Sequence, residues 1–141
     1  MKSRSDIKIF IVGGGEIGRS LAGQLSRDGY ELTLIDRNQD VVKSLSNSFD
    51  IICFEGNGAS YTTLQELSAG KADIWIAVTE SDELNILSCM TAHMMGAKHT
   101  IARIRDVDYA RQNHFYKDKL GLSMIINPEL ATALEEAYPE C

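Results

Sequence analysis

A glycine loop close to the amino terminus constrains the fold of this chain more than any other feature. The loop follows four apolar residues at positions 9–12, and a segment with helical spacing begins inside it. Its sequence is Gly13-Gly14-Gly15-Glu16-Ile17-Gly18, which satisfies the pattern G-x-G-x-x-G. A glycine-rich turn alone is a weak signal. A strand before it and a helix after it supply the context that a dinucleotide-binding loop requires.

Each glycine of the pattern has its own expected role. Gly13 permits a tight turn, Gly15 lets a pyrophosphate approach the backbone, and Gly18 lets the helix pack closely on the strand. The first turn of the helix also offers unpaired N–H groups and the positive end of the helix dipole to an anion. The loop therefore predicts a site for nucleotide phosphates.

Along the rest of the chain, short apolar runs alternate with longer segments of helical period, as expected for a parallel α/β sheet. The predicted strands are Lys8–Val12, Glu31–Ile35, Ile51–Phe54, Asp73–Thr79, Thr100–Ile104 and Met124–Ile126. The predicted helices are Glu16–Asp28, Gln39–Ser48, Tyr61–Ser68, Glu83–Met95, Val107–Leu120 and Pro128–Ala137. Right-handed crossovers then give a Rossmann-like, doubly wound parallel sheet of six strands in the order 3-2-1-4-5-6.

Two of the predicted helices have an apolar side that we expect to face the core. On the first helix this side consists of Ile17, Leu21, Ala22 and Leu25. On the fourth it consists of Leu84, Leu87, Met90 and Met94.

The 141 residues fit one domain, so residues 1–141 are expected to form a single Rossmann domain. The sequence ends at Cys141, soon after Pro139 and just past the last predicted helix, and we expect it to be part of a longer parent protein.

Composition excludes several classes of function. The net charge of −6 argues against non-specific nucleic-acid binding. The longest apolar runs, such as residues 74–78, fall short of the roughly 20 residues of a membrane helix, so no direct membrane insertion is expected. The three cysteines form no Cys-x-x-Cys pair and no metal-ligand spacing. We expect Cys53 and Cys89 to be core residues in a reducing compartment, and no metal site.

Asp36 supports the nucleotide interpretation because it ends the second predicted strand, 18 residues after Gly18. An acidic side chain at this point can accept a hydrogen bond from a ribose 2′-hydroxyl. It would also repel a 2′-phosphate, although the neighbouring Arg37 could partly offset that repulsion. NAD(H) or an ADP/ATP-type ligand is therefore favoured over NADP. The alternative is that Asp36 only caps the next helix.

Three further segments are expected at the same edge of the sheet. Residues 56–60 form a polar turn that either contacts adenosine or is a plain turn. In residues 79–85, Thr79 and Asn85 are ligand candidates, whereas Glu80 and Glu83 are expected to cap a helix or face solvent. Arg103 and Arg105 lie two residues apart on one side of a strand, and each is either a phosphate ligand or part of a structural salt bridge.

No catalytic constellation is evident, and no catalytic residue is predicted. The sequence lacks a Tyr-x-x-x-Lys pair, and we expect its histidines, His93, His99 and His114, to be surface or structural residues. One alternative function is nevertheless the cofactor-binding half of an NAD-dependent dehydrogenase. Another is an assembly domain that retains the fold without binding a nucleotide.

Several motifs in their order along the chain resemble the N-terminal Rossmann domain of Trk/Ktr-type potassium-transport regulatory proteins, also called the RCK or KTN domain. The motifs cover almost the whole chain. They are the segments 11–18, 34–36, 55–60, 77–85, 101–106 and 126–130. The first is shared with many dinucleotide enzymes, whereas Thr-x-x-Asp-Glu-x-Asn followed by Ala-Arg-Ile-Arg is much more specific.

The resemblance implies a cytoplasmic regulator, not an enzyme, that binds NAD(H), ATP or ADP. It implies a homodimer or a higher ring, positioned at the inner face of the cell membrane by a potassium-transport subunit that it gates. It also implies roles for individual residues: the glycine loop at the phosphates, Asp36 at the ribose, Asn57, Ala59 and Thr79 beside the adenosine, and Arg103 near the phosphates. The site residues are then Gly13, Gly14, Gly15, Glu16, Ile17, Gly18, Asp36, Arg37, Asn57, Gly58, Ala59, Thr79 and Arg103.

Overall fold

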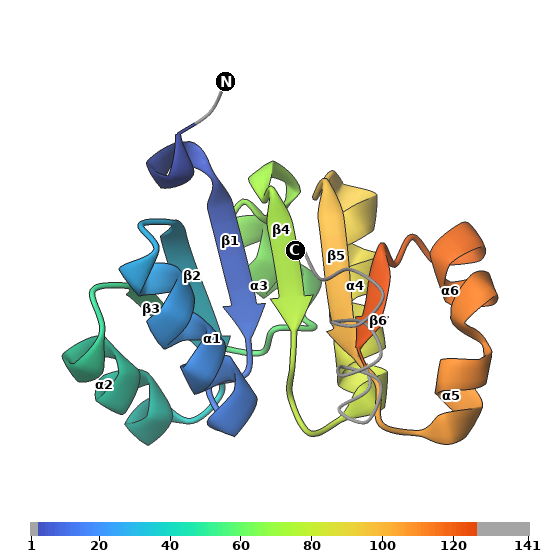
Figure 1. The fold of residues 1–141 in the computed structure, drawn as a ribbon, viewed down its shortest axis with the longest axis horizontal. Helices are drawn as coiled ribbons and strands as arrows, with labels where there is room; N and C mark the ends of the chain where they lie inside the picture. The colour runs from blue at the N-terminus through green and yellow to red at the C-terminus, as the bar shows by residue number, and fades with distance from the viewer. Residues whose placement is uncertain (1–2, 127–141) are drawn as a thin grey trace.

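A twisted parallel sheet of six strands forms the centre of the molecule (Figure 1). The computed structural model describes residues 3–126. The strands are β1 (Lys8–Val12), β2 (Glu31–Asp36), β3 (Ile52–Glu55), β4 (Ile74–Ala77), β5 (His99–Arg103) and β6 (Met124–Ile126). They pair in the order β3-β2-β1-β4-β5-β6, and every neighbouring pair is parallel. The doubly wound topology expected from the sequence is therefore confirmed.

Helices cover both faces of this sheet: α1 and α2 lie on one face, and α3 and α4 on the other (Figure 1). The α-helices are α1 (Glu16–Arg27), α2 (Gln39–Ser48), α3 (Tyr61–Glu66), α4 (Asp82–Met95), α5 (Val107–Arg111) and α6 (Asn113–Lys119). Two short 3-10 helices, η1 (Arg4–Asp6) and η2 (Ala69–Lys71), were not expected from the sequence.

The predicted bounds lie within two residues of the observed ones, and two of the differences have a physical cause. The fourth strand stops at Ala77 because the backbone N–H of Thr79 turns to the side chain of Asn85, 2.9 Å away. The predicted helix Val107–Leu120 is two helices, interrupted at Gln112. The second of them begins at Asn113, a residue type whose side chain competes with the helical backbone and favours helix ends.

Alternate residues of β1 enter two separate cores, as expected of a strand that is buried on both faces. Ile9 and Ile11 belong to the core beneath α1 and α2, together with Ala22 of α1. Phe10 and Val12 belong to the core beneath α3 and α4. Phe10 also stacks on Trp75 of β4, with ring centroids 5.1 Å apart. The predicted apolar side of α1 is confirmed, because Ile17, Leu21 and Leu25 pack on the first of these cores.

The prediction for α4 was wrong for two of its four residues, although Leu84 packs against the core beneath α3 and α4. Met94 is 82% exposed and Leu87 is 51% exposed, so the expected apolar stripe faces outward for much of its length. The buried side of α4 consists of Asp82, Asn85, Ser88, Cys89 and Ala92. The small side chains on this side allow the helix to pack close to the sheet. The buried polar groups must find hydrogen-bond partners, and this requirement fixes the rotation of the helix about its axis.

The last predicted helix, Pro128–Ala137, and Cys141 lie outside the described residues. Within residues 3–126, no helix is long and apolar enough to cross a membrane.

Candidate functional site

The glycine loop joins the end of β1 to α1, and two of its glycines are required by its geometry. Gly13 has φ +108°, in the left-handed region that favours glycine. A Cβ on Gly18 would lie 1.7 Å from the carbonyl oxygen of Gly13, so no larger residue fits between helix and strand. The expected roles of the first and third glycines in shaping the loop are thus confirmed.

Gly15 occupies a different environment. It is the N-cap residue of α1, and no side chain caps the helix at this position. A Cβ built on Gly15 would meet no atom within 4 Å, so the first turn of α1 opens onto free space. Unpaired N–H groups at such a helix end attract anions.

The carboxylate of Asp36 holds the glycine loop at the end of β2. One oxygen accepts a hydrogen bond from the backbone N–H of Gly14 at 2.7 Å, and the other accepts one from the N–H of Asn38 at 2.8 Å. Asn38, not Asp36, is the N-cap of α2, because its side chain accepts from the N–H of Asp40. A carboxylate oxygen has a second lone pair, so Asp36 can accept a further hydrogen bond.

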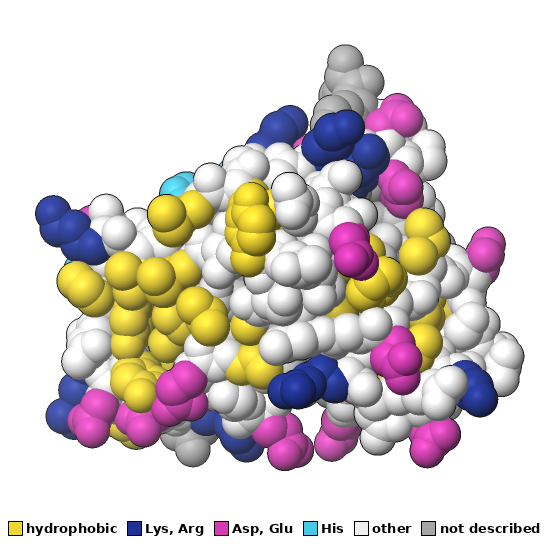
Figure 2. All heavy atoms as spheres, turned by 180° about the vertical axis from the view of Figure 1, so that it is seen from behind, with side chains coloured by type: hydrophobic (Ala, Val, Ile, Leu, Met, Phe, Trp, Pro, Cys, Tyr) yellow, Lys and Arg dark blue, Asp and Glu magenta, His cyan; other side chains and the backbone are white. Residues whose placement is uncertain are grey.

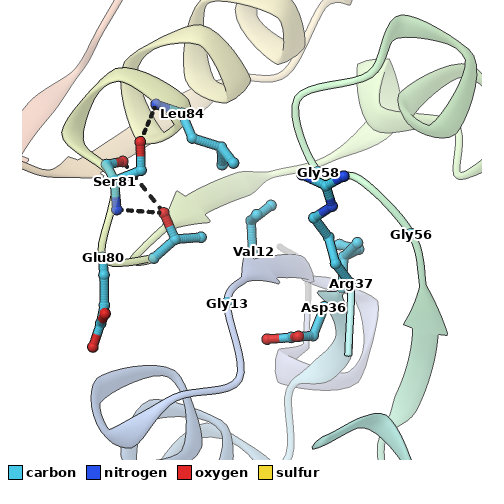
Figure 3. Close-up of a pocket in the computed structure, with 11 residues that line it drawn as sticks. Val12, Gly13, Asp36, Arg37, Gly56, Gly58, Glu80, Ser81 and Leu84 are labelled. Carbon is cyan, nitrogen blue, oxygen red and sulfur yellow. Dashed lines mark hydrogen bonds between the residues drawn. The ribbon is translucent and has the colours of Figure 1, made fainter. Parts of the chain in front are cut away.

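Two cavities meet at this edge of the sheet, and both are lined by Gly13, Asp36, Thr79 and Glu80. The smaller one has a volume of about 290 Å³ and lies between the ends of β1 and β2 and the loops that follow β3 and β4 (Figure 3). The Asp36 carboxylate lies below Val12, and the Glu80 side chain extends away from Leu84 at the edge of the cavity (Figure 3). The larger one, of about 730 Å³, extends along the glycine loop. The four shared lining residues place the two cavities side by side.

The structure brings many of the predicted site residues to these cavities. Arg37 and Gly58 line the smaller cavity, Gly15, Glu16, Ile17 and Arg103 line the larger one, and Gly13, Asp36 and Thr79 line both.

Four predicted site residues, Gly14, Gly18, Asn57 and Ala59, line neither of these two cavities. Gly14 packs against α2, where a Cβ would lie 2.6 Å from Val41. The side chain of Asn57 accepts from the N–H of Ala59 at 3.0 Å and so shapes the turn.

Asn85 is a structural residue, and its expected role as a ligand was wrong. It is fully buried, and its side-chain oxygen accepts from both the N–H and the hydroxyl of Thr79, at 2.9 and 2.7 Å. Its side-chain nitrogen donates to the carbonyls of Thr79 and Arg103 at 3.0 and 2.9 Å. All four of its hydrogen-bonding positions are used, so Asn85 joins the end of β4 to the end of β5.

The two arginines of the fifth strand region differ. Arg103 lines the larger cavity, and its Nε is buried without a hydrogen-bond partner among the described residues. Such a guanidinium is suited to a phosphate. Arg105 follows the end of β5, and its guanidinium donates to the backbone carbonyl of Glu80. The spacing of two residues predicted that both arginine side chains lie on one side of the strand. The strand ends at Arg103, however, so Arg105 lies outside the sheet.

Sequence reasoning missed the apolar wall of the smaller cavity, which is formed by Val12, Ile35 and Leu84. The first two end or nearly end their strands at the carboxyl edge, and that position was the available signal. Glu80 is exposed, as expected, and it also borders both cavities, which was not expected.

The described residues include no group of three or more His, Cys, Asp or Glu side chains that could hold a metal ion. Burial raises the pKa of the Cys89 thiol to about 12, and its Sγ lies 3.4 Å from the carbonyl oxygen of Ile101. Cys53 is partly buried, packs against the core beneath α1 and α2, and has its pKa raised by burial. Both thiols are therefore poor nucleophiles, as expected for core residues.

Comparison with known proteins gives a match to the TrkA-N domain family over residues 9–128. A Trk system potassium uptake protein TrkA homolog of Methanothermobacter thermautotrophicus is 33% identical over 125 residues, which are 89% of this chain and 56% of that protein. Other curated relatives are matched over as little as 27% of their length. The chain thus spans about half or less of the relatives that it matches.

Solved structures share the fold. The TrkA-N domain of the inner membrane protein ybaL from Escherichia coli has a TM-score of 0.78 at 19% identity, with 96% of this chain and 99% of that chain covered. The GsuK channel bound to NAD has a TM-score of 0.72 at 18% identity, with 89% of this chain and 22% of that chain covered. The family match covers most of this sequence, so the chain belongs to the TrkA-N domain family.

Proposed function

We propose that residues 1–141 form one nucleotide-binding regulatory domain that takes NAD(H) or ATP/ADP and contributes to the control of potassium transport. The observation that carries this proposal is the open amino end of α1 at Gly15, beside a carboxylate at the end of β2 and an apolar cavity. The curated relatives are named as potassium uptake proteins, and a GsuK channel has been solved with NAD bound.

The nucleotide would lie along the two neighbouring cavities. Its phosphates face the backbone of the glycine loop at Gly13, Gly15, Glu16 and Ile17, with the Arg103 guanidinium opposite. Gly14 and Gly18 contribute by holding the loop against α2 and β1.

The adenosine would occupy the smaller cavity. The ribose lies beside Asp36 and Arg37, and the base lies between Gly58 and Thr79. Asn57 and Ala59 maintain the turn that carries Gly58. The Asp36 carboxylate repels a 2′-phosphate, so NAD(H) is favoured over its phosphorylated counterpart.

We also propose that the domain works in an assembly: a homodimer or higher ring that is cytoplasmic and held at the inner membrane face by a potassium-transport subunit. Figure 2 shows hydrophobic side chains gathered on the left of the view, at the end of the molecule formed by α4, α5 and α6. The exposed apolar residues of these helices are Leu87, Met94, Val107 and Phe115. Exposed apolar groups that gather in this way support contact with another protein, here a second copy of the chain.

The regulatory mechanism follows from linkage. A nucleotide that binds one arrangement of the assembly more tightly shifts the population toward it, by no more than its difference in affinity for the two arrangements. This role needs no chemical step. We therefore expect no hydride transfer by the purified protein with NAD(H) and candidate substrates, in contrast to the dehydrogenase alternative.

Gly15→Val tests the site directly. The new Cβ meets no atom of the fold within 4 Å, and the valine side chain fills the approach of a phosphate to the first turn of α1. Thermal melting with and without saturating NAD+ or ADP should show stabilisation of the wild type and none of the variant. Ser20→Val, at an exposed position of the same helix, should behave as wild type. A full ligand-dependent shift in Gly15→Val would overturn the proposed phosphate site.

A further inference from the structure

The buried side of α4 carries polar side chains where a helix packed on a sheet normally carries apolar ones. Asp82, Asn85 and Ser88 lie three residues apart, so they occupy one side of the helix. Asp82 is 8% exposed, and the other two are fully buried. Polar groups in such positions are costly unless they are hydrogen-bonded, so their partners indicate what they are for.

Each of the three residues reaches a different loop at the nucleotide edge of the sheet. Asp82 accepts from the backbone N–H of Arg105 and of Asp106, at 3.0 and 2.7 Å, and so holds the loop after β5. Asn85 holds the ends of β4 and β5 through the four hydrogen bonds described above. Ser88 donates to the carbonyl oxygen of Gly58, 2.5 Å away, and so holds the loop after β3.

The contact at Ser88 continues further into the core. Its hydroxyl oxygen accepts a hydrogen bond from the indole Nε1 of Trp75 at 2.9 Å. Trp75 is fully buried and is the single tryptophan of the chain. A continuous path of two hydrogen bonds therefore runs from the indole of β4, through α4, to the loop that lines the smaller cavity.

Gly58 lies where a small movement of its loop changes the cavity. A Cβ on Gly58 would fall 2.2 Å from Cγ1 of Val12, so the glycine backbone rests directly on the end of β1. Val12 and Gly58 both line the smaller cavity. The position of the Gly58 carbonyl, which Ser88 fixes, thus sets the separation of two of its walls.

We propose that α4 is the element that positions the nucleotide-binding loops, and that Ser88 is the positioning residue for the base-side loop, with Trp75 as its internal reporter. This inference rests on the proposed nucleotide function. Ser88 lines neither cavity, so it acts through Gly58. A nucleotide that contacts this loop displaces the Gly58 carbonyl, alters the hydrogen bond of the Ser88 hydroxyl to the indole, and changes the emission of Trp75.

The test compares the wild type with Ser88→Ala, and uses Thr91→Ala as a matched control. Thr91 lies one turn further along α4, and its hydroxyl only donates within the helix, to the carbonyl of Leu87. Each protein is titrated with NAD+ and with ADP, by calorimetry and by tryptophan emission. NAD+ and ADP absorb near the excitation band of tryptophan, so excitation is placed at its red edge, and free tryptophan is titrated in parallel.

We expect nucleotide binding to change Trp75 emission in the wild type and in Thr91→Ala. In Ser88→Ala we expect an affinity about tenfold lower, the scale of one lost buried hydrogen bond, and loss of the emission response while calorimetry still detects binding. A structural role alone would lower the melting temperature and leave the emission response intact.

The outcomes separate the two proposals. Binding heat in the wild type without any emission response overturns the reporter path, even if Ser88→Ala fails to fold. Unchanged affinity and emission response in a folded Ser88→Ala overturn the role of Ser88 and leave the nucleotide site standing. No binding heat in the wild type with either ligand overturns the proposed function itself, and this inference with it.

Discussion

Asp36 has two separable roles, and replacing it with alanine should reveal both. In the absence of a ligand, the carboxylate accepts one hydrogen bond from the buried loop residue Gly14 and one from Asn38. The bond to Asn38 is exposed, so water replaces much of it after the substitution. The bond to Gly14 is partly buried and charge-assisted, and its loss should lower the free energy of unfolding by about 1.5–3 kcal/mol.

The second role is in ligand binding and can be isolated by changing the ligand. If Asp36 accepts the ribose 2′-hydroxyl, the wild type should bind 2′-deoxy-ADP more weakly than ADP by roughly 10- to 150-fold, corresponding to about 1.5–3 kcal/mol. In Asp36→Ala the two ligands should bind equally, because the partner of the hydroxyl is missing. The comparison is a double-mutant cycle in which one of the two changes is made on the ligand. A general loosening of the loop weakens the binding of both ligands equally, so it cancels from the difference between their affinities.

Calorimetric titration of both proteins with both ligands provides the four affinities. Asp40→Ala, which removes an exposed carboxylate from the first turn of α2, controls for the change in net charge. An equal preference for ADP over 2′-deoxy-ADP in the wild type and in Asp36→Ala would refute the assignment of the ribose to Asp36.

Three further changes test other parts of the structure. Gly18→Ala should lower stability by about 3 kcal/mol or more in denaturant unfolding, because its Cβ would overlap the Gly13 carbonyl oxygen; a loss below the error of the titration would contradict the close packing. Arg103→Gln should weaken binding of ADP more than binding of adenosine, and equal losses for both would remove Arg103 from the phosphates. With Cys141 replaced by serine, Cys89 should resist alkylation at pH 8 until the protein unfolds, and Cys53 should react more slowly than a free thiol. The thiolate is the reactive form, and burial raises the pKa of both thiols. Rapid labelling of two thiols in the native protein would contradict this.

The fold could be predicted because its signals are local and repeated. Apolar runs of strand length alternate with helical segments, and handedness then leaves few possible topologies. The break at Gln112 could not be predicted in this way, because Val107–Leu120 keeps a helical spacing on both sides of it.

The orientation of α4 was predicted wrongly for a physical reason. Leu87 and Met94 have large apolar side chains, and hydrophobic periodicity assigns such residues to the core. The helix is oriented instead by Asp82, Asn85 and Ser88, whose partners lie far away in sequence. The recurrence of three small polar residues at every third position of a largely apolar helix was the available signal.

The site was predictable where one residue type is required by geometry. Gly13 and Gly18 are of this kind, since a left-handed turn and a close approach of helix to strand require glycine there. Asn57 and Ala59 are not, because a polar turn in the sequence does not show which of its atoms face a cavity.

The most direct test of the nucleotide-binding proposal is a calorimetric titration of the purified 141-residue chain with NAD+, NADH, ADP and ATP. We expect saturable binding of at least one of them at one site per chain, and loss of that binding in Gly15→Val, whose new Cβ meets no atom of the fold within 4 Å. Absence of binding by all four to the folded wild-type protein would contradict the nucleotide site and favour a domain that serves assembly alone.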